Sequence, residues 1–401
     1  MGSHDRKVVL CSWSLTTGGI ERTVIELAAQ LTEHGYETYI LTIAPTVAYP
    51  IPKGVNRIQV DEPQIRESIK YRIIRKLVYL HNGIETMIHL PNFEKRNQNR
   101  MEKLVLSVRQ RAIQEALKPL GNPEKITVIS FGWQLNNLII TSLGGIGYRI
   151  VVHQDSVPGS GVNGTDELKT TMRQYPKADT VIVLTKDMQK YYSPSICEKS
   201  VIIPNPIVAD LPDAFEGCRK KEIVTFCRIV PIKNLVMLVE AFALLHKKHS
   251  DYKLTIYGNN NDSESREYVT SLLELIQIRG LSNYARILPF DPHIHEKVVD
   301  SAMFVQTSDA EGFGNSLFEA MAIGLPVIST DCPCGAPKEY ITNYKNGILV
   351  PVGNVAALAN AMNWIIEHPY EVTQMSREAL RIKDKLGIDS IVNRYEEIID
   401  D

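Results

Sequence analysis

Two glutamates bracket a glycine-rich turn near residue 315. The segment 309–330 reads DAEGFGNSLFEAMAIGLPVIST, so Glu311 and Glu319 stand eight positions apart. The apolar runs MFVQTS before it and PVIST near its end predict strands, and we expect GNSLFEAMAIG between them to form a short helix. The first turn of a helix carries unbonded backbone N–H groups and the positive end of the helix dipole, which together attract phosphate.

The residue types in this turn suit a ligand that carries both phosphate and hydroxyl groups. Gly312 and Gly314 would let a ligand approach the backbone closely. A carboxylate repels phosphate but accepts hydrogen bonds from sugar hydroxyls, so an acid on each side suits a nucleotide sugar, with one sugar at each end of a diphosphate. The alternative is that Glu311 is a solvated loop residue and Glu319 a surface charge. The residues of the turn that we predict to bind the nucleotide sugar are Gly312, Phe313, Gly314, Asn315, Ser316 and Glu319.

Length and composition describe a folded protein rather than a disordered chain. The sequence has 401 residues, of which 44% are hydrophobic and 22% charged. This length predicts two or three domains, and we take two as the working number. The formal net charge is −2, so nothing in the overall charge favours nucleic-acid binding.

The cysteines predict reduced thiols and no metal site. They are Cys11, Cys197, Cys218, Cys227, Cys332 and Cys334. Only the last two are close, and their one-residue gap fits no common zinc or redox spacing. The sequence holds no apolar run of about 18 residues, and its amino terminus lacks the layout of a secretory signal. We therefore expect a cytoplasmic protein.

Short apolar runs rich in β-branched residues alternate with helical patterns along the chain. Near-continuous apolar strands separated by helices indicate parallel sheets covered on both faces. The pattern pauses at residues 203–222, where prolines and charges indicate a linker, and then restarts. We therefore predict an α/β chain with two doubly wound domains. Ligands of such sheets bind at the carboxyl ends of the strands, so a cleft between the domains is the expected site.

Residues 64–120 interrupt this regularity with a basic insertion. The segment holds twelve Lys or Arg against five acids, a local net charge of +7. Within it, Ile69, Ile73 and Leu77, and also Ile74 and Val78, recur at four-residue spacing between basic residues. Two interpretations stay open. The segment forms either a basic amphipathic helix for an anionic membrane surface, or a helix pair that covers the core and has a solvated face.

Several ordered motifs resemble those of the retaining glycosyltransferases of family four. The stretch from Glu311 to Glu319 is similar to the E-x7-E signature of that family, and CRIVPIKN (227–234) to its R-x4-K phosphate clamp. TTGGIERTVIELA (16–28) resembles its amino-terminal glycine loop, and IPNPI (203–207) its interdomain junction. The resemblance extends over nearly the whole chain and implies the GT-B fold, two facing Rossmann-like domains with a cleft between them.

The resemblance also implies domain bounds. We expect an acceptor-side domain over 1–205, which carries the insertion at about 64–120, and a donor domain over 206–385. A terminal helix over 386–401 should cross back to the first domain. TDCPCGAPKEYI (330–341) resembles a further family segment but departs from it at Ala336, an extra residue, so we give Lys338 and Glu339 no role. Cys227 departs too, since the family often has glycine there.

Roles follow for the matched residues. The resemblance implies that Arg228 and Lys233 hold the donor diphosphate, that Glu319 bonds the ribose hydroxyls, and that Glu311 bonds the hydroxyls of the transferred sugar. His153 should contact the donor sugar, while Gly18 and Gly19 admit the diphosphate or the acceptor close to the backbone. Arg22 should add positive charge to the cleft. The predicted catalytic residues are Arg228, Lys233, Glu311 and His153.

The implied activity is transfer of a hexosyl unit from a nucleoside diphosphate sugar, with a UDP-sugar favoured, to an acceptor hydroxyl with retention of configuration. The sequence has no D-x-D triplet of the kind that holds a divalent ion on the diphosphate, so protein cations should take over that task without metal or cofactor.

The expected acceptor is a cell-envelope glycan or a lipid-linked saccharide, which would place the protein in the cytoplasm, with peripheral attachment to the inner face of the membrane as one possibility. The alternatives are a nucleotide-sugar epimerase or sugar phosphorylase of the same fold, and a noncatalytic partner subunit of a glycosyltransferase complex. The sequence does not predict the oligomeric state.

Overall fold

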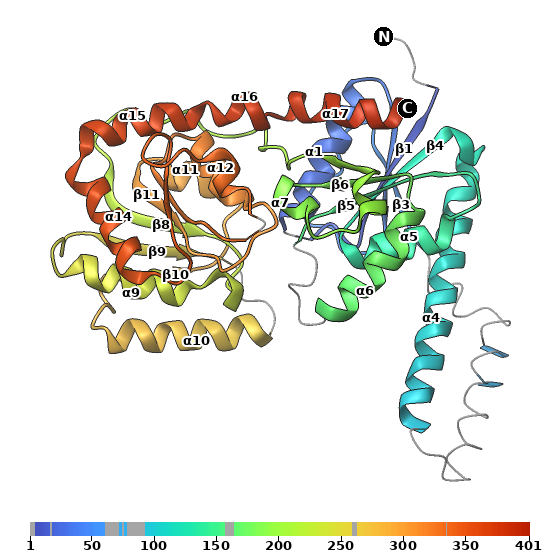
Figure 1. The fold of residues 1–401 in the computed structure, drawn as a ribbon, viewed down its shortest axis with the longest axis horizontal. Coiled ribbons are helices and arrows are strands. Elements are labelled where there is room, and N and C mark those ends of the chain that lie inside the picture. The colour runs from blue at the N-terminus through green and yellow to red at the C-terminus, as the bar shows by residue number, and fades with distance from the viewer. Residues whose placement is uncertain are drawn as a thin grey trace.

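Two parallel sheets organise the chain (Figure 1). The computed structural model describes residues 5–16, 18–60, 72–73, 76–77, 93–156, 164–258, 263–333 and 335–401. Near-continuous buried β-branched and aliphatic residues form the strands, as a sheet covered on both faces requires. The predicted α/β class is confirmed. Of the predicted basic helix, only residues 72–73 and 76–77 lie inside the described part of the chain.

The first sheet has the strand order β3-β2-β1-β4-β5-β6-β7, and each neighbouring pair is parallel. Its strands are β1 (Lys7–Ser12), β2 (Glu37–Thr42), β3 (Asn56–Gln59), β4 (Ile126–Phe131), β5 (Arg149–Gln154), β6 (Thr180–Val183) and β7 (Ser200–Ile202). Its α-helices are α1 (Gly19–Glu33), α4 (Phe93–Leu117), α5 (Trp133–Leu143), α6 (Gly164–Gln174), α7 (Lys186–Gln189) and α8 (Pro194–Cys197). Short 3-10 helices span Lys118–Leu120, Pro123–Lys125 and Tyr175–Lys177.

The second sheet has the order β10-β9-β8-β11-β12-β13, again parallel throughout. Its strands are β8 (Lys220–Phe226), β9 (Lys253–Tyr257), β10 (Ala285–Leu288), β11 (Ser301–Gln306), β12 (Val327–Thr330) and β13 (Ile348–Val350). Its helices are the 3-10 helix Pro231–Lys233, α9 (Leu235–His246), α10 (Ser263–Ile278), α11 (Ile294–Val298), α12 (Asn315–Ala322), α13 (Pro337–Tyr340), α14 (Val355–Glu367) and α15 (Pro369–Leu380). In both sheets the carboxyl ends of the strands supply the loops discussed below.

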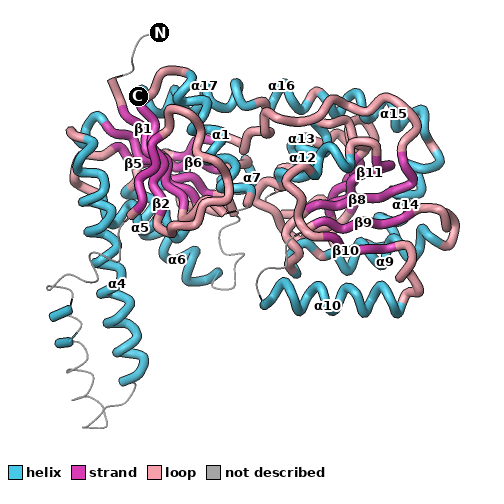
Figure 2. Tube along the Cα trace, turned by 180° about the vertical axis from the view of Figure 1, so that it is seen from behind, coloured by secondary structure: helices cyan, strands magenta, loops and turns pink. Residues whose placement is uncertain are grey.

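The last helices connect the two domains. After α15, α16 (Ile382–Leu386) and α17 (Ile388–Asp400) run along one side of the molecule and bring the carboxyl end of the chain back to the first sheet, where α17 packs on α1 (Figures 1 and 2). Ile391, Val392 and Tyr395 of α17 share a buried core with Val8 and Leu10 of β1. The end of the chain thus completes the core of the domain that begins it.

This packing predicts a stability effect far from any ligand. Ile391 is 1% exposed, so Ile391→Ala should lower the free energy of unfolding by about 2 kcal/mol or more, because it leaves a cavity between α17 and the first sheet. Ile278→Ala, at the 74% exposed end of α10, makes the same chemical change on the surface and should stay within about 0.5 kcal/mol. Urea unfolding of both variants measures the difference. Equal midpoints would contradict the packing of α17 on the first domain.

Candidate active site between the two domains

The glycine-rich turn of the second domain leads from β11 into α12, which occupies the predicted helical stretch. Gly314 lies at the N-terminal end of α12 with φ of 89°, a left-handed conformation, and a Cβ there would stand 3.1 Å from the side chain of Gln306. Both facts favour glycine. Phe313 is buried against Phe318 at a ring distance of 4.7 Å, so its side chain belongs to the core and only its backbone can serve a ligand.

Lys233 of the predicted phosphate clamp and Glu311 of the predicted sugar site face each other. Lys233 ends a 3-10 turn after β8, and its Nζ lies 2.5 Å from Oε1 of Glu311. Their side chains are 15% and 10% exposed, and Ser308 donates a hydrogen bond of 2.7 Å to the same carboxylate oxygen. Such a partly buried, hydrogen-bonded pair fixes both groups in place. The first acid of the motif therefore orients the lysine.

Arg228 also follows β8, and its side chain is exposed. It lies close enough to Glu21 of α1, in the other domain, to act on its pKa. Burial raises the pKa of Glu21, while the positive charge of Arg228 lowers it. The guanidinium is thus an exposed cation near the boundary between the domains.

Glu319 is held from both domains. Nε2 of His295 in α11 lies 2.9 Å from its Oε2, and Nη1 of Arg22 in α1 lies 4.0 Å from its Oε1. Burial acts to raise the pKa of Glu319, but the hydrogen bond and charge of His295, with the charge of Arg22, outweigh it and hold the pKa below its usual value. The second acid is therefore an ionised hydrogen-bond acceptor.

The glycine loop of the first domain approaches the start of α12. Gly18 precedes α1 in an extended conformation, and a Cβ on Gly19 would stand 3.0 Å from Nδ2 of Asn315. Asn205, from the predicted interdomain junction, donates a 3.0 Å hydrogen bond to Oδ1 of the same asparagine. Asn315 is thus contacted from the first domain and from the linker. Ser316 follows it in α12 and is half-buried.

His153 is the last residue but one of β5. Its side chain is 0% exposed, between Phe131 at 4.8 Å and Tyr395 of α17 at 6.4 Å. Its Nδ1 lies 2.8 Å from Oδ1 of Asp155. The backbone of Asp155 meets the second domain, because a Cβ on Gly312 would stand 2.1 Å from its carbonyl oxygen. The predicted contact of His153 with the donor sugar would therefore require the residues that cover its ring to move.

Lys338 and Glu339, which received no role from the sequence, bridge the domains. Glu339 of α13 accepts a 2.9 Å hydrogen bond from the backbone N–H of Lys186, and Lys338 forms an ion pair with Asp187, both on α7. The sequence also gave no role to His295, Asp155 or Asn205. Their signal is spatial, since their contacts with Glu319, Gly312 and Asn315 join residues 24, 157 and 110 positions apart along the chain.

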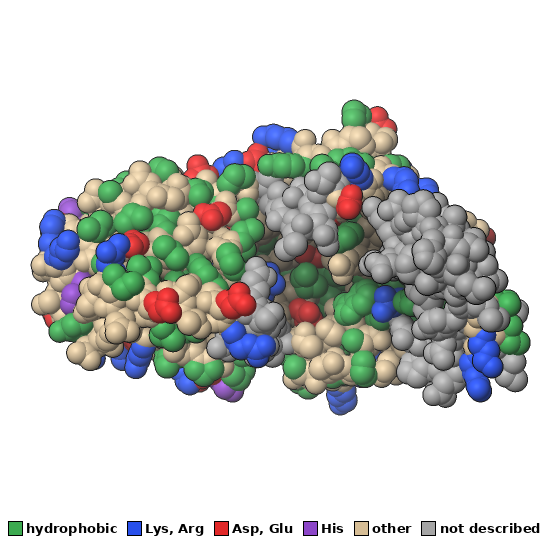
Figure 3. All heavy atoms as spheres, turned by 90° about the horizontal axis from the view of Figure 1, so that it is seen from below, with side chains coloured by type: hydrophobic (Ala, Val, Ile, Leu, Met, Phe, Trp, Pro, Cys, Tyr) green, Lys and Arg blue, Asp and Glu red, His purple; other side chains and the backbone are tan. Residues whose placement is uncertain are grey.

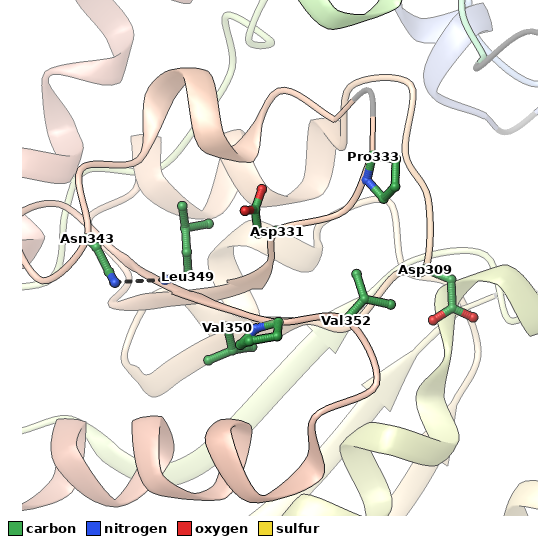
Figure 4. Close-up of a pocket in the computed structure, with 8 residues that line it drawn as sticks. Asp309, Asp331, Pro333, Asn343, Leu349, Val350 and Val352 are labelled. Atoms are coloured by element: carbon green, nitrogen blue, oxygen red, sulfur yellow. Dashed lines mark hydrogen bonds between the residues drawn. The ribbon is translucent and has the colours of Figure 1, made fainter.

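The surface between the two lobes is hollowed, and acidic side chains lie in the hollow (Figure 3). A pocket of about 640 Å³ lies at the carboxyl ends of β11, β12 and β13 (Figure 4). Its lining is Asp309, Asp331, Pro333, Asn343, Leu349, Val350, Pro351 and Val352. Within the described ranges, no group of three or more His, Cys, Asp or Glu side chains is arranged to hold a metal ion, and every helix is too short or too polar to span a membrane.

Comparison with known sequences finds similarity to glycosyltransferases. Residues 215–381 match the model of the family described as Glycosyl transferases group 1. Over 257 residues the chain is 28% identical to an exopolysaccharide phosphotransferase of Streptomyces coelicolor, which covers 62% of this chain and 26% of that protein. Over 260 residues it is 22% identical to a poly(glycerol-phosphate) alpha-glucosyltransferase of Bacillus subtilis, with coverage of 62% and 36%. The chain thus spans well under two thirds of the length of these relatives.

Comparison with solved structures concerns the fold. The structure of HepE from Anabaena in complex with UDP-glucose superposes with a TM-score of 0.74 at 17% identity, over 98% of this chain and 99% of that one. TarM of S. aureus superposes with a TM-score of 0.75 at 16% identity, over 99% and 100%. The predicted GT-B fold and the predicted resemblance to glycosyltransferases are confirmed.

Proposed function

Because residues 215–381 match the group 1 glycosyltransferases, we propose that this protein transfers a hexosyl unit from a nucleoside diphosphate sugar to an acceptor hydroxyl, with retention of anomeric configuration. One observation carries the proposal. Lys233, Glu311 and Glu319 lie around the start of α12, where free N–H groups and a fixed ammonium can receive a diphosphate.

The cations act on the leaving group. As the bond between the anomeric carbon and the phosphate oxygen breaks, negative charge grows on the departing diphosphate. Lys233, the exposed Arg228 and the backbone N–H groups at Asn315 and Ser316 stabilise that charge without rearrangement, because they are already in place. The second carboxylate oxygen of Glu311 accepts hydrogen bonds from the sugar that is transferred, and Glu319 accepts them from the ribose.

The first domain supplies the acceptor side. The acceptor hydroxyl attacks from the face that the diphosphate leaves, and its proton passes to the departing phosphate oxygen, so configuration is retained and neither glutamate becomes bonded to the sugar. Gly19 and Gly312 let the two domains close around the reacting groups. His153 in β5 and Asp155 in the loop that follows it contribute to this space from the side of the first domain.

The relatives support the proposed donor and acceptor classes. HepE is described in complex with UDP-glucose, and this supports a UDP-sugar as donor. The Bacillus relative is named a poly(glycerol-phosphate) alpha-glucosyltransferase, and this supports a cell-envelope glycan or lipid-linked saccharide as acceptor. Protein cations replace a divalent ion on the diphosphate in this proposal.

A thermal-shift screen tests the donor. The purified chain, mixed with UDP, GDP and ADP and their glucose forms, should be stabilised by one nucleotide class, because a ligand that binds only the folded state raises the melting temperature. UDP and UDP-glucose should give the largest shift. The same shift in excess EDTA is expected for metal-independent binding. If no nucleotide raises the melting temperature and none of the sugars is hydrolysed, the proposal fails.

Attachment to an anionic membrane surface is a separate part of the proposal. Ile73 and Leu77 are 53% and 59% exposed, with Arg72 and Lys76 exposed beside them at the same four-residue spacing. Vesicles that contain phosphatidylglycerol should therefore sediment the protein at low salt, with release as the ionic strength rises. The double variant Ile73→Ser/Leu77→Ser should lose this binding. Equal sedimentation of both proteins would contradict the membrane role of these residues.

A further inference from the structure

Glu319 has a histidine neighbour that lies outside the sequence motif. His295 is the second residue of a short helix, α11, that precedes β11, and its side chain is 5% exposed. Its ring meets the ring of Phe226 edge-on at 5.5 Å, which fixes the plane of the imidazole. Nε2 then points at Oε2 of Glu319 from 2.9 Å. The histidine is thus itself held in place by the core of the second domain.

A carboxylate that is 12% exposed needs such a partner. An ionised acid taken out of water loses its hydration, and without a hydrogen-bond donor it either takes up a proton or turns towards solvent. The contact with His295 occupies one oxygen of Glu319, so the other oxygen is left on the side of Arg22 and the first domain. This is the oxygen that a ribose could reach.

We propose that His295 is a positioning residue, which orients Glu319 and keeps it ionised as the acceptor for the ribose hydroxyls of the donor. The inference rests on the proposed function. It adds that donor affinity, rather than the bond-breaking step, depends on this histidine. The ligand class is a nucleoside diphosphate with free 2′ and 3′ hydroxyls.

The other charged and titratable groups around Glu319 come from two further elements. Arg22 and Glu26 of α1 and Tyr49 of the loop after β2 interact electrostatically with it or with its neighbours. Burial raises the pKa of both Glu26 and Tyr49. Removal of His295 leaves Arg22 as the only one of these groups that opposes the burial of Glu319 among the described residues, and it stands 4.0 Å away. The pKa of Glu319 should then rise.

The test compares two nucleotides that differ only in the ribose hydroxyls. The nucleoside diphosphate that the thermal-shift screen selects, UDP in the first instance, is titrated beside its 2′,3′-dideoxy form. The wild-type protein should bind the natural nucleotide at least about tenfold more tightly, since hydrogen bonds to a charged acceptor are lost with the hydroxyls. His295→Leu keeps the volume but removes the donor, and it should reduce this ratio to about threefold or less. His295→Gln retains an N–H donor and should restore it at pH 8.

Measurement of this affinity ratio at acid pH distinguishes a positioning role of His295 from a loss of folding. In the wild-type protein the ratio should persist from pH 8 to pH 5, because the pKa of Glu319 lies below its usual value. In His295→Leu the ratio should fall as the pH is lowered, because the buried carboxyl takes up a proton. His293→Ala, on an exposed residue two positions away, is the matched control and should behave like the wild-type protein. In steady-state assays the KM for the donor should rise in His295→Leu while kcat changes less than threefold.

These experiments distinguish failure of the inference about His295 from failure of the proposed function. If the wild-type protein prefers the natural nucleotide and His295→Leu keeps the full preference at every pH, the inference is wrong and the proposed function stands. If the wild-type protein binds no nucleoside diphosphate, both fail. Should His295→Leu not fold, His295→Ala enters the same titration, and unchanged ribose preference in that variant overturns the inference equally.

Discussion

Replacement of Lys233 by alanine should lower kcat roughly a hundred- to thousandfold, with a smaller effect on the melting temperature. The expected size is that of losing one preorganised charge that acts on the transition state. Lys233 meets this description because Glu311 and a 3-10 turn already hold its ammonium near the start of α12, so no energy is spent on moving it during the reaction. Initial rates with saturating donor and acceptor measure the loss.

Two comparisons show whether this loss arises from the charge. Lys221→Ala removes an exposed lysine that pairs with Asp251 on the same domain, and it should leave the rate within about twofold. Lys233→Arg keeps the charge in a wider, planar group and should recover part of the rate. A Lys233→Ala enzyme with kcat within fivefold of the wild-type value would remove the ammonium from the mechanism.

The sequence predicted the layout well because the layout depends on local patterns. Apolar runs alternate with helical periodicity over the whole chain. A continuous apolar run predicts a strand that is buried on both faces, and β4 and β11 are such strands, buried at every residue. The pause at 203–222 covers the connection between β7 of the first sheet and β8 of the second, although its last three residues already belong to β8. Such features involve neighbours along the chain and need no knowledge of distant contacts.

In the candidate site, too, the features that depend on local sequence could be predicted and those that depend on packing could not. The turn around Gly314 and the facing pair of Lys233 and Glu311 belong to motifs that the sequence displays, and the structure brings them together. Their assignment to donor and sugar remains a prediction. Phe313 shows the limit of a motif, since its position was predicted but the direction of its side chain, into the core against Phe318, depends on packing.

Residues that join the two domains could not be predicted from the sequence. Asp155 meets Gly312 from the end of β5, and Asn205 meets Asn315 from the linker. Each contact depends on how two separately folded units are placed, and no local periodicity records that placement. His295 is hidden for a related reason, because α11 precedes β11 and α12 follows it, and only the packing of these two helices brings His295 beside Glu319.

The contact between Gly312 and Asp155 leads to the second large effect. Gly312→Ala should lower kcat/KM about a hundredfold or more while each domain stays folded. The added Cβ would stand 2.1 Å from the carbonyl oxygen of Asp155 and 3.2 Å from Cα of Ser156, which are backbone atoms of the other domain and cannot turn away as a side chain could. The domains must separate to relieve this clash. A displacement of about 1 Å between reacting groups is enough to cost two orders of magnitude.

Gly217→Ala provides the matched control. The three atoms nearest to the same methyl group added there all belong to the ring of Phe215 in its own loop. That variant should keep its activity within about threefold. Small-angle scattering should show a larger radius of gyration for Gly312→Ala than for Gly217→Ala in the presence of UDP, and the unfolding midpoints should differ by little. Because the two variants share one chemical change and differ in what it touches, equal rates would mean that catalysis does not need the arrangement in which Gly312 meets Asp155.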